Sequence, residues 1–242
     1  MDIDGLKISS GRSPLGSLVS AGRGGRRPNR LRSFSPDRVA GLECDAWVAY
    51  YQRRWLKFLT AAVGMVRAGF GMSWPRTTLA AWYVLRANQL WAPAPVNDPE
   101  RARRCMQRFY ALLRATYGEP QDPAESARLE VEWWRAHRSG QPAAPAARDE
   151  LVDALVRLYA FVFGVAESDV RPAAVHRSQA MEVSDQWVAQ GRRPGSPLLV
   201  LERAALVRSY EALLVAVHRG TGGQSAAARS DGTDRSDVGP PR

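Results

Sequence analysis

Three histidines are the most obvious candidates for chemistry: His137, His176 and His218 each precede an arginine and follow an acid seven positions earlier. Seven residues span two helical turns, about 10 Å along the axis, so one ion cannot contact both groups. Chelation by a single helix needs a spacing of about three or four residues. At that spacing the histidines have mostly apolar neighbours. The pattern therefore predicts no metal site.

His176 differs from the other two because it lies inside a predicted helix, on an apolar stripe with Trp187. A histidine in such a place is either a hydrogen-bonded core residue or an acid–base group that titrates near neutral pH. We take His176 as the candidate acid–base residue, with the core role as the alternative. His137 and His218 fall in the last turns of predicted helices, where a positive charge complements the helix dipole.

Arg86 is the only charged residue in the apolar segment from Leu79 to Trp91. A helix that is apolar on most sides is typical of the centre of a protein. A charge buried there must be paired, so we expect a carboxylate of another helix to meet Arg86. The available carboxylates are those of Glu130, Glu132, Glu182 and Asp185. Arg86 then forms either a structural ion pair or a two-pronged contact with an anionic ligand.

The candidate site combines His176 as the acid–base group with five ligand-binding residues. These are Arg86, Asn88, Gln89, Glu132 and Asp185. No cofactor can be assigned, because the chain has no dinucleotide fingerprint, Walker loop, nucleophile elbow or paired ExxH motif. Cys44 and Cys105 have no histidine within one turn, and we interpret them as buried thiols.

The formal net charge of +10 places the chain among basic proteins. About half of this charge belongs to residues 1–35, a Gly-, Ser- and Arg-rich segment without apolar periodicity, which we expect to be a disordered tail. The segment is either an uninformative extension or a basic arm for nucleic acid. Arg101, Arg104 and Arg108 form a second basic stripe, but no nucleic-acid-binding motif accompanies it. Nucleic acid is therefore an unfavoured partner.

A period of 3.6 residues runs through the rest of the chain and predicts helices only. Proline or a capping residue marks most of the starts, and glycine marks most of the ends. The expected helices cover about 44–68, 73–91, 98–117, 122–138, 149–163, 169–190 and 196–219. We therefore predict an all-α protein, with about seven helices in one antiparallel or orthogonal bundle.

These helices make up one predicted domain, residues 42–219, followed by a disordered polar tail, residues 221–242. The longest apolar run is too short to cross a bilayer, which takes about 20 residues. No secretory leader is visible, so we expect a cytoplasmic protein without membrane contact. The preference for arginine over lysine indicates a GC-rich bacterial genome.

Three functions remain open, in this order of preference. The first is a binding or regulatory module with an aromatic-lined cleft for a protein partner or a small anionic ligand. The eight tryptophans are expected mainly in the core, and a ligand cage is the alternative role for some of them. The second is a helical enzyme that acts on an anionic small molecule through His176 and Arg86. The third is a nucleic-acid-associated protein that uses its basic arm and the third predicted helix, residues 98–117.

Overall fold

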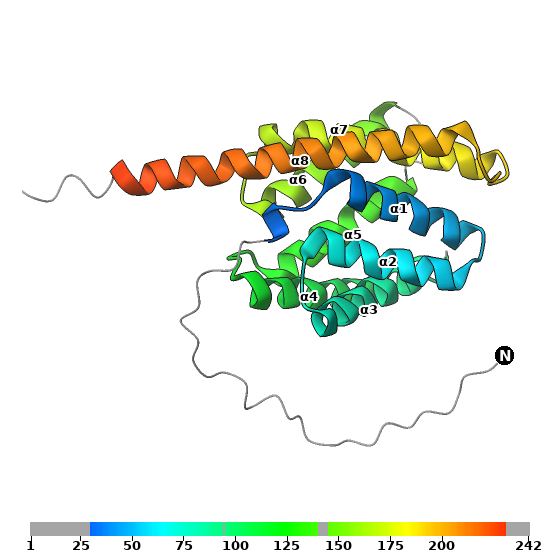
Figure 1. Ribbon diagram of the computed structural model, residues 1–242, viewed down its shortest axis with the longest axis horizontal. Coiled ribbons are helices and arrows are strands. Elements are labelled where there is room, and N and C mark those ends of the chain that lie inside the picture. The colour runs from blue at the N-terminus through cyan, green and yellow to red at the C-terminus, as the bar shows by residue number, and fades with distance from the viewer. Residues whose placement is uncertain (1–29, 94, 140–144, 231–242) are drawn as a thin grey trace, which may run out of the picture.

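The computed structural model describes residues 30–93, 95–139 and 145–230, and this part of the chain contains eight α-helices, one 3-10 turn and no β-strand (Figure 1). The elements are η1 (Arg30–Arg32), α1 (Pro36–Tyr51), α2 (Trp55–Phe70), α3 (Trp74–Trp91), α4 (Pro99–Tyr117), α5 (Pro123–Ser139), α6 (Pro145–Phe163), α7 (Glu167–Ala189) and α8 (Pro197–Ser230). The all-α prediction is confirmed, with eight helices instead of about seven. The predicted tails lie outside the described residues over 1–29 and 231–242.

The additional helix arises because the first predicted helix is two helices, separated at Gln52–Arg54. Arg53 adopts a left-handed conformation, with φ of 56°. The amide of Arg54 donates to the carbonyl of Ala49 at 2.8 Å, and that of Arg53 donates to Tyr50 at 3.0 Å. This pair of bonds is a Schellman motif, in which glycine usually takes the left-handed position. An arginine there gives no glycine or proline signal, so the break was not predicted.

The other predicted starts and ends mostly agree with the structure. The Asp98 carboxylate accepts from the amide of Arg101 at 2.9 Å and caps α4, and Asp122 caps α5 in the same way. Gly118 and Gly164 follow α4 and α6 in left-handed conformations. The end of α8 differs, because the helix continues past the predicted stop at residue 219 to Ser230. Side-chain capping and left-handed glycines are local events, which explains why the sequence reveals them.

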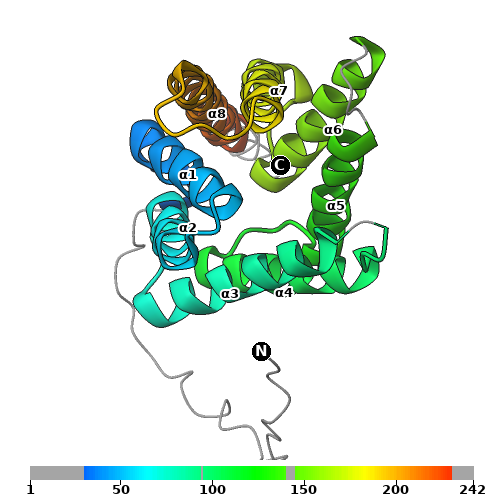
Figure 2. The same ribbon diagram turned by 90° about the vertical axis from the view of Figure 1, so that its right-hand side faces the viewer.

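The helices are arranged as a ring (Figure 2). Each helix packs against the helices before and after it in the chain, and α8 packs against α1 to close the ring. One apolar core lies among α2–α5 and a second lies mainly among α5–α8, while a smaller cluster joins α1 to α7 and α8. The α1–α8 contact is thus the closure that holds the two ends of the described chain together.

The described domain begins before the predicted boundary at residue 42. Leu31 is 2% exposed and Phe34 is 9% exposed, and both belong to the core that α5–α8 build. Arg32 donates to the carbonyl of Phe163 at 2.9 Å, which fixes the same segment to the end of α6. Two apolar residues in a polar, Arg-rich stretch show no helical period, so the sequence pattern does not predict their burial.

Phe34→Ala is expected to lower the free energy of unfolding by about 3 kcal/mol, because the substitution leaves a cavity in the core. The ring of Phe34 meets that of Tyr210 edge-on, with centroids 5.8 Å apart. Urea unfolding measures the loss. Val96→Ala is the control, since Val96 is 83% exposed and its truncation is expected to change stability by less than about 0.5 kcal/mol. Equal losses in the two variants would contradict a core position for Phe34.

Helix α3 is not central, contrary to the prediction. Its buried residues are small: Thr77, Ala80, Ala81 and Ala87. Trp74 is 60% exposed and Trp82 is 56% exposed. Alanine-sized side chains let α3 pack through a narrow face, while Trp74, Leu79 and Trp82 remain exposed. Apolar composition therefore does not report burial for this helix.

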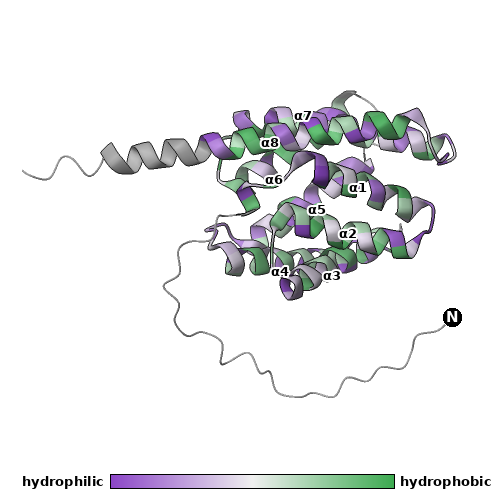
Figure 3. Cartoon of the chain, viewed as in Figure 1, coloured by the Kyte–Doolittle hydropathy of each residue, from purple (hydrophilic) through white to green (hydrophobic). Residues whose placement is uncertain are grey.

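Exposed apolar side chains concentrate on α1, α2 and α3. Of the large hydrophobic residues exposed in the described chain, those on these helices are Trp47, Trp55, Leu56, Leu59, Trp74, Leu79 and Trp82. Within the described residues, no helix has both the length and the apolar character that a bilayer crossing needs. In Figure 3, hydrophilic residues interrupt the hydrophobic ones along the helices. Contiguous exposed apolar surface is typical of interaction sites, so these three helices are the ones to compare with the grooves of the structure.

Candidate functional site

Arg86, Asn88 and Gln89 all have exposed side chains on α3. Arg86 donates to the Oε1 atom of Gln89 at 3.2 Å, and Asn88 donates to the carbonyl of Val84 at 2.9 Å. The expected ion pair of Arg86 is absent from the ion pairs of the described residues. The reason is that Arg86 lies on the water-facing side of α3, where its charge needs no carboxylate.

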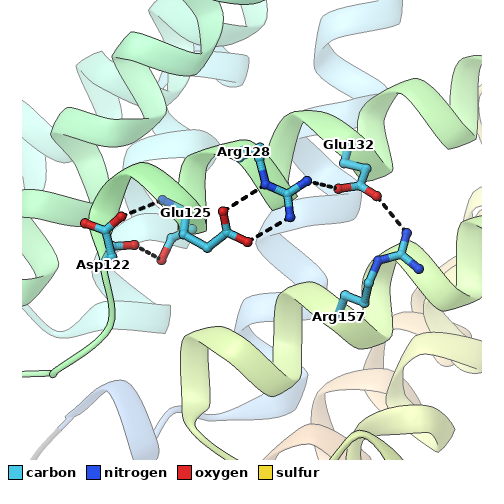
Figure 4. A network of polar contacts seen from close by, with 6 residues as sticks. Asp122, Glu125, Arg128, Glu132 and Arg157 are labelled. Carbon is cyan, nitrogen blue, oxygen red and sulfur yellow. Dashed lines mark hydrogen bonds and ion pairs between the residues drawn. The ribbon is translucent and has the colours of Figure 1, made fainter.

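The four carboxylates expected near Arg86 have other partners. Glu132 accepts from Arg128 at 2.7 Å and from Arg157 at 2.8 Å, so arginines engage both of its oxygens (Figure 4). The same network continues from Arg128 to Glu125. It lies on the exposed faces of α5 and α6, where such pairs contribute at most about 1 kcal/mol each. Glu132 is therefore placed in a surface ion-pair network.

His176 and Asp185 both lie on α7, with separate partners. The Nδ1 atom of His176 is 3.1 Å from the Oε1 atom of Gln179, and the Oδ2 atom of Asp185 is 3.2 Å from the Nε2 atom of His137. Helix α7 packs against α6 and α8, whereas α3 packs against α2 and α4, and the two lie on opposite sides of the ring (Figure 2). The structure therefore does not bring His176 and Arg86 together.

A buried ion pair that the sequence pattern did not reveal joins α1, α7 and α8. Glu43 is 5% exposed and accepts from Arg177 through both oxygens, once at 2.7 Å, and from the Tyr210 hydroxyl at 2.6 Å. Burial, followed by the charge of Glu43, raises the pKa of Tyr210 well above its ordinary value. Three helices thus meet at one charged cluster, in which both oxygens of Glu43 have donors. The Arg177 Nε atom has no hydrogen bond among the described residues.

A second interior cluster joins α4 to α5. Glu130 accepts from the Tyr110 hydroxyl at 2.6 Å and from the Trp133 indole at 3.1 Å. Burial raises the pKa of Glu130, and these two hydrogen bonds oppose the shift. Because both carboxylate oxygens already have donors, we interpret this cluster as a packing element.

The turn between α1 and α2 carries a cluster of aromatic rings, which we call the aromatic hairpin: Trp47, Tyr50, Tyr51, Trp55 and Phe58. Trp47 stacks on Tyr51 with centroids 5.9 Å apart, and Tyr50 contacts Trp55 at 6.2 Å. Tyr51 also meets the buried Trp187 of α7 at 6.1 Å. These contacts hold the hairpin rigid, although Trp47 is 39% exposed and Trp55 is 55% exposed.

A groove of about 570 Å³ lies between α1 and α2, and we call it the α1–α2 groove. It is lined by Leu42, Asp45, Val48, Ala49, Gln52, Arg54, Leu56, Lys57, Thr60 and Ala61. Leu56 is 82% exposed. Both polar atoms of the Gln52 amide are buried and have no hydrogen-bond partner among the described residues. Since buried polar groups are nearly always paired, this amide is an exception beside the groove.

The groove and the hairpin are surrounded by positive charge. Arg53, Arg54, Lys57, Arg192 and Arg193 are exposed, and none of them takes part in an ion pair between described residues. The guanidinium of Arg192 lies 5.8 Å from the centre of the Tyr51 ring. Asp45, the acid of the groove, is already paired with Arg203 at 2.8 Å. Exposed cations without an ion-pair partner attract anionic groups.

Among the described residues, no group of three or more His, Cys, Asp or Glu is placed to hold a metal ion. Cys44 and Cys105 are free and buried, as predicted. Comparison with family models, with curated proteins and with solved structures finds no match.

Two signals in the sequence could have indicated the groove. The stretch from Tyr50 to Leu59 combines six aromatic or leucine residues with three cations, Arg53, Arg54 and Lys57. Aromatic residues interleaved with cations are typical of binding surfaces. The periodicity assigned these rings to the core, because a pattern of period 3.6 does not show that a helix ends at Arg53.

Proposed function

We propose that this protein is a binding module that takes an acidic, amphipathic helix of a partner protein into its α1–α2 groove. The observation that carries the proposal is the unpaired amide of Gln52 in an apolar groove bordered by cations without ion-pair partners. The proposal keeps the class of function preferred from the sequence, a binding protein, but the groove is lined by aliphatic and polar side chains and the aromatic rings belong to the neighbouring hairpin. The buried free thiols of the protein suit the reducing cytoplasm, which we propose as its location.

The apolar part of the groove suits the apolar face of a helix. Two packed helices form its walls, and such walls accept side chains spaced at i, i+3, i+4 and i+7 on the bound helix. Leu56 and Trp55 stand at its edge, largely exposed. An exposed tryptophan beside arginine resembles the few residues that supply most of the affinity of an interface, and the neighbouring leucine adds apolar contact area.

The charges select among partners. Arg54 and Lys57 line the groove, and Asp45 is neutralised by Arg203. A helix with glutamates flanking its apolar face would pair with both cations without meeting a free carboxylate. Complementary charges also speed the encounter of the two proteins.

The alternative functions have less support. The enzyme hypothesis needed Arg86 and His176 in one pocket, and they lie on opposite sides of the ring. A small anionic ligand would instead use a second, smaller groove of about 350 Å³, which is lined in part by Trp91, Arg135 and Arg138. There the Arg138 guanidinium already stacks 4.2 Å from the centre of the Trp91 ring. Nucleic acid would use cations alone and would leave the apolar groove unexplained.

The test is the binding of a labelled peptide of about 14 residues, about four helical turns, with leucines on one face and glutamates on the other. We expect Trp55→Ala combined with Leu56→Ala to weaken binding at least about tenfold, which corresponds to about 1.4 kcal/mol. Trp82→Ala combined with Val96→Ala is the matched control, because these residues are 56% and 83% exposed, against 55% and 82% for Trp55 and Leu56. Fluorescence anisotropy measures the affinity.

A second comparison tests the charges. Arg54→Glu combined with Lys57→Glu should abolish binding of the acidic peptide, whereas Arg101→Glu combined with Arg104→Glu on α4 should not. Equal affinity for a peptide with lysines in place of glutamates would overturn the proposal. So would binding to phosphatidylserine vesicles or to duplex DNA without any binding of the acidic peptide.

A further inference from the structure

Glu202, on α8, is a carboxylate in an unfavourable place. It is 2% exposed, and its Oε2 atom is buried without a hydrogen-bond partner. A buried carboxylate that lacks full pairing costs much more as an anion than as a neutral acid. Glu202 therefore differs from Glu43, whose two oxygens are both occupied.

The groups that face Glu202 come from all the elements packed around it. On α1 these are the Glu43 carboxylate, the Cys44 thiol and the Tyr51 hydroxyl; on α7 they are Arg177 and the Ser184 hydroxyl; on α8 itself it is Arg203. The two cations are already committed, Arg177 to Glu43 and Arg203 to Asp45. Two buried carboxylates therefore share a single buried guanidinium, and Glu43 binds it.

Burial, followed by the negative charge of Glu43, raises the pKa of Glu202 from 4.5 to about 7. The same surroundings raise the pKa of Cys44 to about 12, with burial as the largest cause and Glu202 next. The Cys44 thiol therefore stays neutral near pH 7. Glu202 is then the group of this cluster that changes charge in the physiological range.

Arg203, the neighbour of Glu202 in the chain, is linked to the α1–α2 groove through one of the residues that line it. Arg203 pairs with Asp45, which lines the groove. Arg203 also lies close over Gly41, where an added Cβ atom would be 3.0 Å from its Nη1 atom. Glu202 and Arg203 thus hold α8 against α1 together, one from the interior and one from the surface.

We propose that Glu202 is a pH switch for the α1–α2 groove: its protonated form keeps α8 on α1 and Arg203 on Asp45, and its ionised form loosens both. The inference rests on the proposed function only for its effect on binding. Ionisation places a second anion beside Glu43, and α8 relieves the repulsion by moving from α1. Asp45 then loses its partner and repels an acidic helix. The groove therefore binds acidic partners better below neutral pH than above it.

The first experiment needs no partner. Because the folded chain keeps the Glu202 proton up to about pH 7, while the unfolded chain releases it near 4.5, the stability that this group provides is lost as pH rises through that window. The unfolding equilibrium constant should rise with pH by up to about tenfold per unit. Urea unfolding between about pH 5 and 8.5 measures this slope in the wild type and in Glu202→Gln.

In Glu202→Gln, the slope of the free energy of unfolding against pH should fall by the equivalent of close to one proton. Glu130, whose pKa is also raised, should account for the slope that remains. Glu202→Leu is the second variant without an ionisable group and should give the same reduced slope if the glutamine variant does not fold. An unchanged slope in both variants, or in the one that folds, would overturn the switch.

The second experiment uses the acidic peptide. Its affinity for the wild type should fall by up to about tenfold per unit above pH 7, and the affinity should be level in Glu202→Gln. Asp45→Asn should keep the stability slope but lose the pH dependence of binding. A normal slope with pH-independent peptide affinity in the wild type would overturn the coupling to the groove. Failure of the peptide to bind at any pH would overturn the proposed function instead, leaving the stability result to decide the switch.

Discussion

Arg177→Met is expected to lower the free energy of unfolding by about 3–5 kcal/mol, the usual result of removing one partner of a buried ion pair. Glu43 is 5% exposed, and the guanidinium of Arg177 contacts both of its oxygens. Without Arg177, only the Tyr210 hydroxyl remains to stabilise the carboxylate. Methionine fills much of the vacated volume, so the loss reports charge rather than a cavity. Urea unfolding at pH 7.5 measures it.

Two controls separate the ion pair from general disruption of α7. Arg157→Met breaks the exposed contact with Glu132 and should cost less than about 1 kcal/mol. Glu43→Leu combined with Arg177→Met removes both buried charges and should be more stable than Arg177→Met alone. A loss below about 1 kcal/mol for Arg177→Met would show that Glu43 reaches water or another cation.

The same ion pair shows why part of the interior could not be predicted. Glu43 and Arg177 are 134 positions apart. Sequence periodicity places Arg177 on a helix and Glu43 next to the start of one, but only the closure of α8 on α1 brings α7 within reach of Glu43. Local signals have no information on such a contact. The residues that could be predicted, such as Asp98 and Gly118, act within a few positions of themselves.

The candidate site could be predicted only as a kind of surface. The sequence predicts an aromatic-lined cleft, whereas the structure has a cluster of aromatic rings at the turn between α1 and α2, next to a groove that is lined by aliphatic and polar side chains. Its position was missed because Arg53 takes the left-handed place that glycine usually occupies, so the sequence shows no turn. Arg86 was expected to be buried because a helix with few charges was taken as central. The small residues Ala80 and Ala87 show instead that α3 packs through a narrow face.

These two errors have one cause. Hydrophobic periodicity separates the faces of a helix, but it does not show which apolar face meets a neighbour. Trp55 and Trp82 have the same pattern as buried tryptophans, yet each is more than half exposed. Side-chain size would have been a better guide for α3, because close helix packing selects alanine over tryptophan. An excess of large apolar residues over the available neighbours then indicates a surface for a partner.

Trp187→Ala is expected to lower the free energy of unfolding by about 3–5 kcal/mol, as truncation of a fully buried tryptophan does. Trp187 is 1% exposed. Its indole donates to the carbonyl of Arg193 at 3.0 Å, which fixes the turn between α7 and α8, and its ring meets Tyr51 of the aromatic hairpin. The substitution therefore removes packing at the place where the end of α7 supports the α1–α2 turn. Thermal and urea unfolding both measure the loss.

Trp82→Ala is the matched control, because it removes the same ring from an exposed site and should cost less than about 0.5 kcal/mol. The two variants also separate support from contact. Trp187 does not line the α1–α2 groove. At a temperature where the variant is folded, Trp187→Ala should therefore lower the affinity for the acidic peptide only by loosening the hairpin. Restoring a ring with Trp187→Phe should recover most of that affinity, although the bond to the Arg193 carbonyl stays lost. If phenylalanine restored stability but not affinity, the indole hydrogen bond rather than ring packing would position the hairpin.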